Sequence, residues 1–265
     1  MEISGLNVGY PNICKSWQGE GPFAGQRIVV LRFNVCNLKC HWNTADGDMA
    51  WCDTKKTWDG TEKGDTWDVD VLAALIGDIA RRKLKPANWE PEDWKSARKP
   101  ASIVMITGGE PMLRQNDAAF QALVARLHGD GLLVHVETNG TIPPGEWARQ
   151  NIDFFVVSPK YQLYPKAYSE AKTKEWLKVM GVQVAWKFVV GRAYDLELLR
   201  QWLHEMSMPF DADIWLMPLT DDKKDLHYAQ NVLEGGTVAA IQILGYKSVQ
   251  LSPRLQIGLG RDLFP

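Results

Sequence analysis

Short apolar runs alternate with amphipathic stretches along most of this chain. Six runs of five or six mainly apolar residues are bounded by Gly, Pro or charged residues, a pattern typical of buried strands. They span residues 28–33, 102–106, 132–136, 153–157, 186–190 and 213–217. Between them, apolar residues recur at helical spacing over 68–82, around Phe120 to Leu127 and around Leu199 to Met206, and Asp68 is a suitable N-cap for the first of these helices.

Alternating strands and helices predict parallel strands joined by right-handed helical crossovers. Six strands are too few for a closed eight-stranded barrel, so we expect an α/β fold of the open, partial (β/α)6 barrel type. Each strand ends in a polar loop at the carboxyl edge, where parallel α/β proteins bind ligands. The chain lacks an internal repeat or a clear linker, which predicts a single domain over residues 1–265 with polar insertions near 41–50, 83–100 and 161–183.

Composition narrows the class of protein. The net charge is −2, from 30 basic and 32 acidic residues without long runs of one sign, so a direct nucleic-acid-binding surface is not indicated. No apolar run reaches membrane-spanning length and the N-terminus does not resemble a signal peptide, which predicts a cytoplasmic protein without a membrane segment. The twelve Trp residues are scattered and are interpreted as packing residues.

Three of the four cysteines, Cys36, Cys40 and Cys52, lie within one short stretch. Few, bunched cysteines favour a metal site in a reducing compartment over a disulfide framework. Three thiolates can hold three irons of a [4Fe–4S] cluster and leave the fourth open. The alternative is a zinc site of these cysteines, with His41 as a further ligand. Cys14, in an apolar strand-like segment, is interpreted as a packing residue.

The segment Thr107 to Pro111, Thr-Gly-Gly-Glu-Pro, follows a predicted strand. Paired glycines allow close approach of the backbone to a ligand, and exposed backbone groups can bind a polar amino-acid moiety. Together with the cysteine loop one βα unit upstream, this segment resembles the radical S-adenosylmethionine (SAM) enzymes. Their minimal loop has three and then two residues between cysteines and an aromatic before the last; here Trp51 takes the aromatic position and about nine residues are inserted.

Further segments are similar to the 7-carboxy-7-deazaguanine synthase family. They are Ser16 to Gly21, Arg32-Phe33, Cys52-Asp53-Thr54, Glu137 to Gly140 and Ser158-Pro159-Lys160. The resemblance implies a lyase that converts 6-carboxy-5,6,7,8-tetrahydropterin into 7-carboxy-7-deazaguanine with release of ammonia, in 7-deazapurine (queuosine-type) biosynthesis. It also implies a [4Fe–4S] cluster, SAM as the radical source and Mg²⁺, with the chemistry carried by the cofactors and the positioning by the protein.

Matched residue by residue, the resemblance implies the following roles. Cys36, Cys40 and Cys52 hold the cluster. SAM is contacted or supported by Gly109, Glu110, Glu137, Thr138, Ser158 and Lys160. The pterin is bound by Trp17, Gln18, Gly19, Glu20, Arg32, Thr107 and the terminal carboxylate of Pro265. Arg32 suits the substrate carboxylate because a guanidinium can bind it bidentately, and Thr54 suits Mg²⁺, which prefers oxygen ligands.

The chain departs from the family pattern at Met217 to Thr220 and at Leu251 to Gln256, which leaves substrate contacts from this half open. The acidic loop Asp46-Gly47-Asp48 lacks the other ligands of a calcium loop and is interpreted as a solvated turn. By the same resemblance we expect a homodimer and a flavodoxin-type or other electron donor. Two alternatives are a glycyl-radical activase, which needs an open protein-docking groove, and a zinc-stabilised module without catalysis.

Overall fold

The computed structural model describes residues 6–43, 49–52, 54–58, 64–81, 101–179, 183–191, 193–219, 245–246 and 248–258. Its main element is one curved nine-stranded sheet in the order β11-β10-β9-β8-β7-β6-β2-β1-β5. The seven strands from β2 to β11 are parallel, and β1 and β5 add antiparallel strands at one edge. Because the sheet has two ends, the barrel is open, as the sequence predicts.

All six predicted strands are present. They are β2 (Arg27–Phe33), β6 (Ile103–Gly108), β7 (Leu133–Thr138), β8 (Phe154–Val157), β9 (Val184–Val190) and β10 (Asp213–Pro218). The strands not predicted as part of this series are β1 (Leu6–Trp17), β5 (Asp65–Trp67) and β11 (Ser248–Leu251). A separate two-stranded sheet pairs β3 (His41–Asn43) with β4 (Met49–Trp51).

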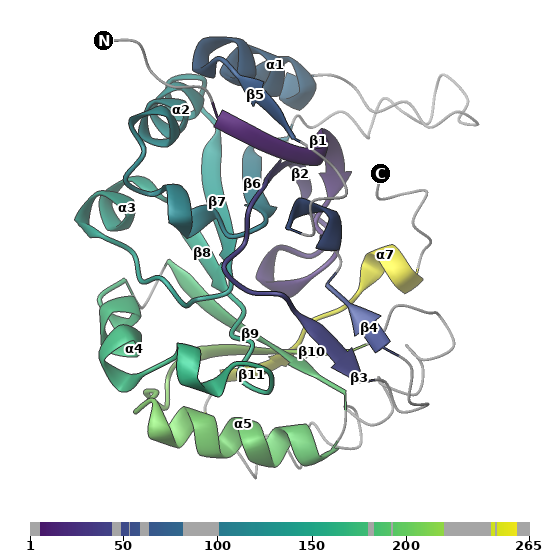
Figure 1. Ribbon diagram of the computed structural model, residues 1–265, viewed down its shortest axis with the longest axis vertical. Helices are drawn as coiled ribbons and strands as arrows, with labels where there is room; N and C mark the ends of the chain where they lie inside the picture. Colours follow the sequence, from purple (N-terminus) through teal and green to yellow (C-terminus); the bar gives the residue numbers. More distant parts are fainter. Residues whose placement is uncertain are drawn as a thin grey trace.

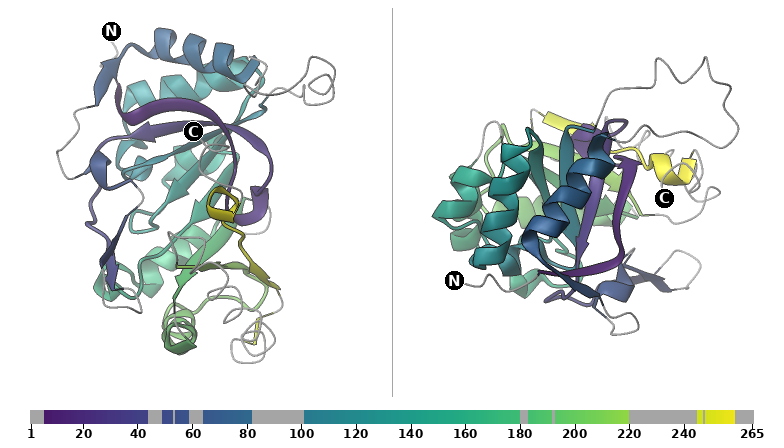
Figure 2. Two further views of the ribbon diagram at one scale, coloured as in Figure 1. Left: turned by 90° about the vertical axis from the view of Figure 1, so that its right-hand side faces the viewer. Right: turned by 90° about the horizontal axis from the view of Figure 1, so that it is seen from above.

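Helices line the outer side of the curved sheet (Figures 1 and 2). They are α1 (Val69–Arg81), α2 (Ala118–Gly129), α3 (Glu146–Asn151), α4 (Glu170–Leu177) and α5 (Ala193–Glu205), while the short α7 (Leu255–Gly258) lies on the other side. Short 3₁₀ turns lie in the connections between these elements: η1 (Gly21–Phe23), η2 (Lys55–Thr57), η4 (Pro111–Arg114) and η5 (Pro165–Ala167). The polar stretch 161–183, expected as an insertion, contains η5 and α4, and α4 is the crossover from β8 to β9.

Alternate positions of each strand pack against the helices. Val29, Leu31 and Phe33 of β2 join the large core together with Leu72 of α1 and Phe120 of α2. Buried aromatic residues such as Trp176 and Phe155, whose ring centroids are 5.3 Å apart, extend this core towards α4. Since side chains alternate across a strand, the remaining positions face the interior of the barrel. The insertion near 83–100 lies outside the described residues.

Long-range polar contacts hold the added strands in place. Lys15 of β1 is buried and donates to the carbonyl oxygen of Ala80 at 2.9 Å, which satisfies one of the last carbonyls of α1. Asp68 accepts hydrogen bonds from the backbone N–H groups of Asp70 and Val71, so it caps α1 as the sequence predicts. Among the described helices none is long and apolar enough to cross a membrane.

Candidate functional site

The interior of the barrel changes from apolar to polar along the strands. Near their amino ends the inward positions are Ile28, Val30, Ile103 and Met105, which form a small apolar cluster. Near their carboxyl ends the inward positions are polar: Arg32, Thr107, Glu137, Ser158 and Lys187. Arg32 pairs in register with Thr107, and hydrogen bonds join Glu137 to Thr107 and to Lys187. These polar residues therefore form one layer across neighbouring strands, called the polar ring below, at the edge where ligands bind in parallel α/β folds.

A hairpin turn forms the floor below the polar ring. η1 lies between β1 and β2, and its Phe23 packs on His135 and Phe154 with ring centroids 4.4 and 4.7 Å apart. Burial lowers the pKa of His135 to about 4, so the imidazole is neutral near pH 7. The apolar floor excludes water from below, so polar chemistry is confined to the layer above it.

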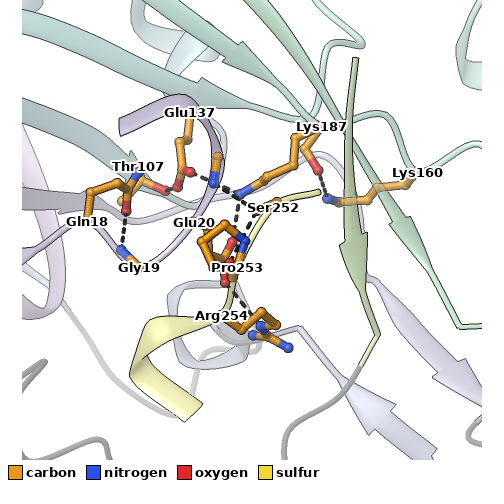
Figure 3. A network of polar contacts seen from close by, with 12 residues as sticks. Gln18, Gly19, Glu20, Thr107, Glu137, Lys160, Lys187, Ser252, Pro253 and Arg254 are labelled. Atoms are coloured by element: carbon orange, nitrogen blue, oxygen red, sulfur yellow. Dashed lines mark hydrogen bonds and ion pairs between the residues drawn. The ribbon is translucent and has the colours of Figure 1, made fainter. Parts of the chain in front are cut away.

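Four charged side chains meet in the polar ring (Figure 3). The ammonium of Lys187 donates to Glu20 Oε2 at 2.7 Å and to Glu137 Oε1 at 3.0 Å. Arg254 Nε donates to Glu20 Oε1 at 3.2 Å, and Thr107 Oγ1 donates to Glu137 Oε2 at 3.2 Å. Burial lowers the pKa of Lys187, but the carboxylates of Glu137 and Glu20 outweigh it and raise that pKa above its ordinary value. Lys187 is therefore a permanent cation.

The N-terminal segment expected at the pterin is split between the interior and the surface. Gln18 is buried; its Oε1 accepts from Gly19 N, and its Nε2 has no hydrogen-bond partner among the described residues. The carbonyl of Gly19 accepts from Leu255 N, which joins this segment to the C-terminal part of the chain. Trp17 does not lie with the polar ring. It is 36% exposed beside the amino end of β2, where the guanidinium of Arg27 lies 4.8 Å from its ring centroid.

The two ends of the insertion between Cys40 and Cys52 pair as antiparallel strands. β3 begins directly after Cys40 and β4 ends directly before Cys52, with His41 paired to Trp51. The N–H of Cys52 donates to the carbonyl of Cys40 at 3.3 Å. The insertion is thus looped out, and the two cysteines flanking it become neighbours as they are in the short loop. The acidic residues 46–48 lie outside the described residues.

Side chains from β7 and from the loop after β8 hold the cysteine loop. Asn139 donates to Asn37 Oδ1 at 2.8 Å and to Cys36 Sγ at 3.9 Å. Tyr164 OH accepts from Lys39 N and donates to Lys39 O. These contacts tie the loop to the carboxyl edge of the sheet, beside the polar ring.

Burial raises the pKa of the Cys36 thiol to about 11 and that of the Cys40 thiol to about 12, and the neighbouring cysteines add to the rise. The positive charge of Lys160 opposes it at Cys40. Across the ranges that the structure describes, no three His, Cys, Asp or Glu side chains gather closely enough to hold one metal ion, as the zinc alternative would need. A [4Fe–4S] cluster differs, because each thiolate binds a separate iron.

The paired glycines of the Thr107–Pro111 segment lie against the chain's own backbone. A Cβ on Gly109 would lie 2.0 Å from the carbonyl oxygen of Val35, and Gly108 has φ +101°. Gly109 N donates to Phe33 O at 2.8 Å, and Glu110 N donates to Val35 O at 2.9 Å. This close contact positions the residues that lead into Cys36.

Glu110 supports the neighbouring loop. It is buried, and its carboxylate accepts from Met112 N at 3.0 Å, Thr138 Oγ1 at 2.7 Å and Asn139 N at 2.8 Å. Burial raises the pKa of Glu110, and these three hydrogen bonds oppose the rise. Because it is buried and bonded to three groups of the protein, Glu110 acts by holding Thr138 and Asn139 in place.

The remaining predicted residues lie around the same edge. Lys160 Nζ donates to Ser158 Oγ at 2.8 Å. Thr54 Oγ1 donates to the carbonyl of Gly108 at 2.7 Å and lies 3.4 Å from Cys52 Sγ. Arg32 Nη1 donates to Cys14 Sγ at 3.6 Å, so Cys14 both packs against the floor and contacts the polar ring. Pro265 lies outside the described residues.

Sequence reasoning missed several residues of this site: Lys187, Arg254, Asn139 and Tyr164. Of these, Lys187 could have been detected from the sequence. Lys187 is a lone charge in the apolar run 186–190, and a lysine within a buried strand requires a partner. Arg254 and Tyr164 could not be found this way, because their roles depend on contacts with residues far away in the sequence.

No protein-family model matches the chain, but solved structures and curated proteins similar to it are known. The fold is similar to that of QueE from Escherichia coli (TM-score 0.58, 22% identity, 93% of each chain covered). It is also similar to Streptococcus suis SuiB bound to S-adenosylmethionine (TM-score 0.51, 13% identity, 84% of this chain and 49% of that one).

Curated relatives give the stronger match. A 7-carboxy-7-deazaguanine synthase of Bordetella pertussis is 37% identical over 153 residues, which is 55% of this chain and 60% of that protein. The enzyme of the same name from Hyperthermus butylicus is 30% identical over 253 residues, 91% of this chain and 88% of that protein. The match to the latter extends over nearly all of both sequences, so the chain belongs to the 7-carboxy-7-deazaguanine synthase family.

Proposed function

We propose that this protein converts 6-carboxy-5,6,7,8-tetrahydropterin into 7-carboxy-7-deazaguanine with release of ammonia. The observation that carries the proposal is the polar ring above an apolar floor, at the same sheet edge as a loop with three cysteines. A polar, carboxylated heterocycle fits the polar ring, and the cysteine loop offers three thiolates as ligands for the cofactor.

The donor set of the loop fits a [4Fe–4S] cluster. Cys36, Cys40 and Cys52 supply three thiolates, and one iron is left for SAM. When bound, the cluster and SAM supply the organic radical that initiates the rearrangement. Because burial raises the pKa of Cys36 and Cys40, both thiols must release protons as they bind iron.

SAM would be bound beside the loop by Thr138, Ser158 and Lys160. Thr138 and Ser158 are joined by a backbone hydrogen bond from Ser158 N to Thr138 O at 2.8 Å, so they follow adjacent strands at one edge. The ammonium of Lys160 is close enough to Cys40 to lower the pKa of that thiol. A cation there suits a ligand that carries a carboxylate.

The pterin would occupy the polar ring. Arg32 offers a guanidinium for the carboxylate of the substrate, and Gln18 Nε2 is a buried donor without a partner among the described residues, which a ring carbonyl or nitrogen would satisfy. Glu20 and Glu137 offer acceptors for ring N–H groups. The structure therefore favours Glu137 as a pterin contact over the SAM-supporting role that the resemblance implies.

Mg²⁺ would be bound by Thr54 together with oxygen atoms of the substrate. The hydroxyl of Thr54 donates its proton to Gly108 O, and its oxygen is a hard ligand atom of the kind that Mg²⁺ prefers. From the family resemblance alone we further propose a cytoplasmic homodimer supplied with electrons by a flavodoxin-type or other donor.

The test is anaerobic reconstitution with iron and sulfide, followed by an assay with reductant, SAM and the carboxytetrahydropterin, in which the product is identified by mass. We expect formation of the deazaguanine and a brown protein that bleaches on reduction. Replacing Cys36, Cys40 or Cys52 by Ala should abolish cluster retention, whereas Cys14→Ala should keep it. A colourless protein with one tight zinc ion, or loss of the cluster in Cys14→Ala, would contradict the proposal.

A further inference from the structure

We propose that Lys187 is a positioning residue for substrate recognition, which holds the carboxylates of Glu20 and Glu137 as paired hydrogen-bond acceptors facing the ring N–H groups of the pterin. This inference rests on the proposed function and goes beyond it, because neither the motifs nor the family resemblance assigns Lys187 a role.

The contacts orient both carboxylates completely. In Glu20, Oε2 accepts from Lys187 at 2.7 Å and Oε1 accepts from Arg254 at 3.2 Å. In Glu137, Oε1 accepts from Lys187 at 3.0 Å and Oε2 accepts from Thr107 at 3.2 Å. Each carboxylate oxygen has two lone pairs and can accept more than one hydrogen bond. Figure 3 shows these side chains converging from separate parts of the chain.

Lys187 also links three separate segments of the chain. It comes from β9 in the middle of the sheet, Glu137 from β7, and Glu20 from the turn before η1. Its neighbours Trp186 and Phe188 belong to the core on the helix side, which fixes the direction of the lysine side chain into the barrel. Lys187 is 5% exposed, so its ammonium lies where water competes weakly for the two carboxylates.

The charges of this cluster balance: Lys187 and Arg254 oppose Glu20 and Glu137. Two further cations lie around it, Arg32 beside Thr107 in register and Lys160 after β8. His135, below on β7, is neutral near pH 7 because burial lowers its pKa to about 4. Recognition at this cluster therefore uses the direction of hydrogen bonds, and Arg32 and Lys160 add positive charge near the carboxylates of a ligand.

The balance of charges in this cluster is lost if the ammonium of Lys187 is removed. Glu20 and Glu137 would then face each other in a buried space, and two carboxylates that share such a site retain a proton between them. The retained proton makes an O–H donor where the pterin ring also presents N–H donors. The substrate then binds only after this proton is lost, so its affinity becomes dependent on pH.

The experiment measures KM for the carboxytetrahydropterin between pH 6.5 and 8.5 in the reconstituted enzyme. We expect Lys187→Met to raise KM about tenfold or more at pH 6.5, the effect of losing a hydrogen bond to a charged group, and KM should fall as pH rises. Lys187→Arg keeps the cation and should keep the pH profile of wild type.

Lys15→Met is the matched control, because it also removes a buried lysine, one that contacts the carbonyl of Ala80 away from the polar ring. It should leave the pH profile of KM unchanged. If Lys187→Met does not fold, the double variant Lys187→Met/Glu137→Gln removes one charge of each sign, and its KM should be raised and independent of pH. A double variant with the KM of wild type would overturn the inference.

The outcomes separate the two proposals. A wild-type enzyme that cleaves SAM but forms no deazaguanine overturns the proposed function itself. A wild-type enzyme that forms it, together with a Lys187→Met variant whose KM follows the wild-type pH profile, overturns only the role of Lys187. An elevated KM without pH dependence in Lys187→Met would mean that the lysine is merely structural.

Discussion

Gly109→Ala is expected to destabilise the protein and release the cluster. The new Cβ would lie 2.0 Å from the carbonyl oxygen and 2.6 Å from the carbonyl carbon of Val35, and both are backbone atoms that cannot move as a flexible side chain does. Relief requires separation of the 108–110 loop from the 33–35 segment. Two hydrogen bonds across this contact, from Gly109 N and Glu110 N, would be lost with it.

The magnitude follows from these two effects. Overpacking in a dense interior costs about 1–3 kcal/mol, and each backbone hydrogen bond contributes about 1 kcal/mol. The free energy of unfolding should therefore fall by about 3–5 kcal/mol in total. Because the 33–35 segment leads directly into Cys36, iron retention should fall as well.

The assay is urea unfolding of the cluster-free protein, followed by the fluorescence of buried tryptophans such as Trp176 and Trp186, together with the iron content after reconstitution. Gly129→Ala is the matched control. Gly129 ends α2, and a Cβ there would meet nothing within 4 Å, so this change should be neutral or stabilising by about 0.5–1 kcal/mol. Equal unfolding midpoints and equal iron contents for the two variants would refute the reasoning.

Three further predictions concern single side chains. His135→Phe should reduce the loss of stability in acid, because the unfolded imidazole takes up a proton below about pH 6.5 and the folded one only near pH 4. In urea unfolding, the free energy of unfolding of wild type should therefore fall by about 2 kcal/mol more than that of the variant between pH 7 and pH 5. Equal losses in the two proteins would contradict this. Thr54→Val should remove the stimulation of turnover by Mg²⁺, whereas Thr54→Ser should keep it. A titration of activity with Mg²⁺ distinguishes the two variants. Unchanged stimulation in the valine variant would exclude Thr54 as a metal ligand. Arg32→Ala should raise KM for the pterin about ten- to a hundredfold and should not affect uncoupled SAM cleavage. If circular dichroism shows loss of the fold, or an iron assay shows loss of the cluster, Arg32 has a structural role instead.

Local patterns in the sequence determined the central fold. The six parallel strands and the main helices are detectable because each buries a continuous apolar run or an apolar face, and burial of that kind is encoded over a few neighbouring residues. The same holds for the cysteine loop and for Asp68 as a helix cap, since both depend on residues close in sequence. Parallel pairing follows from the alternation of strands and helices.

The formation of strands β1, β5 and β11 depends on pairing with segments that are distant in the sequence. β1 reads Leu-Asn-Val-Gly-Tyr-Pro-Asn-Ile-Cys-Lys-Ser-Trp, which lacks a period of two, and its strand form depends on β2 and β5 as partners. The placement of Phe23 on His135 likewise depends on a turn that folds into the barrel. Such contacts leave little trace in either segment alone.

Within the site, the sequence identified residue types and the tertiary structure decided their roles. The chain shows that an insertion separates Cys40 from Cys52, but only the pairing of β3 with β4 brings the two together. It shows the paired glycines, but not that Gly108 lies against the backbone of Phe33 and Gly109 against that of Val35. The Glu20–Lys187–Glu137 cluster joins residues that are 50 and 167 positions apart in the sequence, because charges buried in one interior must pair wherever the fold brings them into contact.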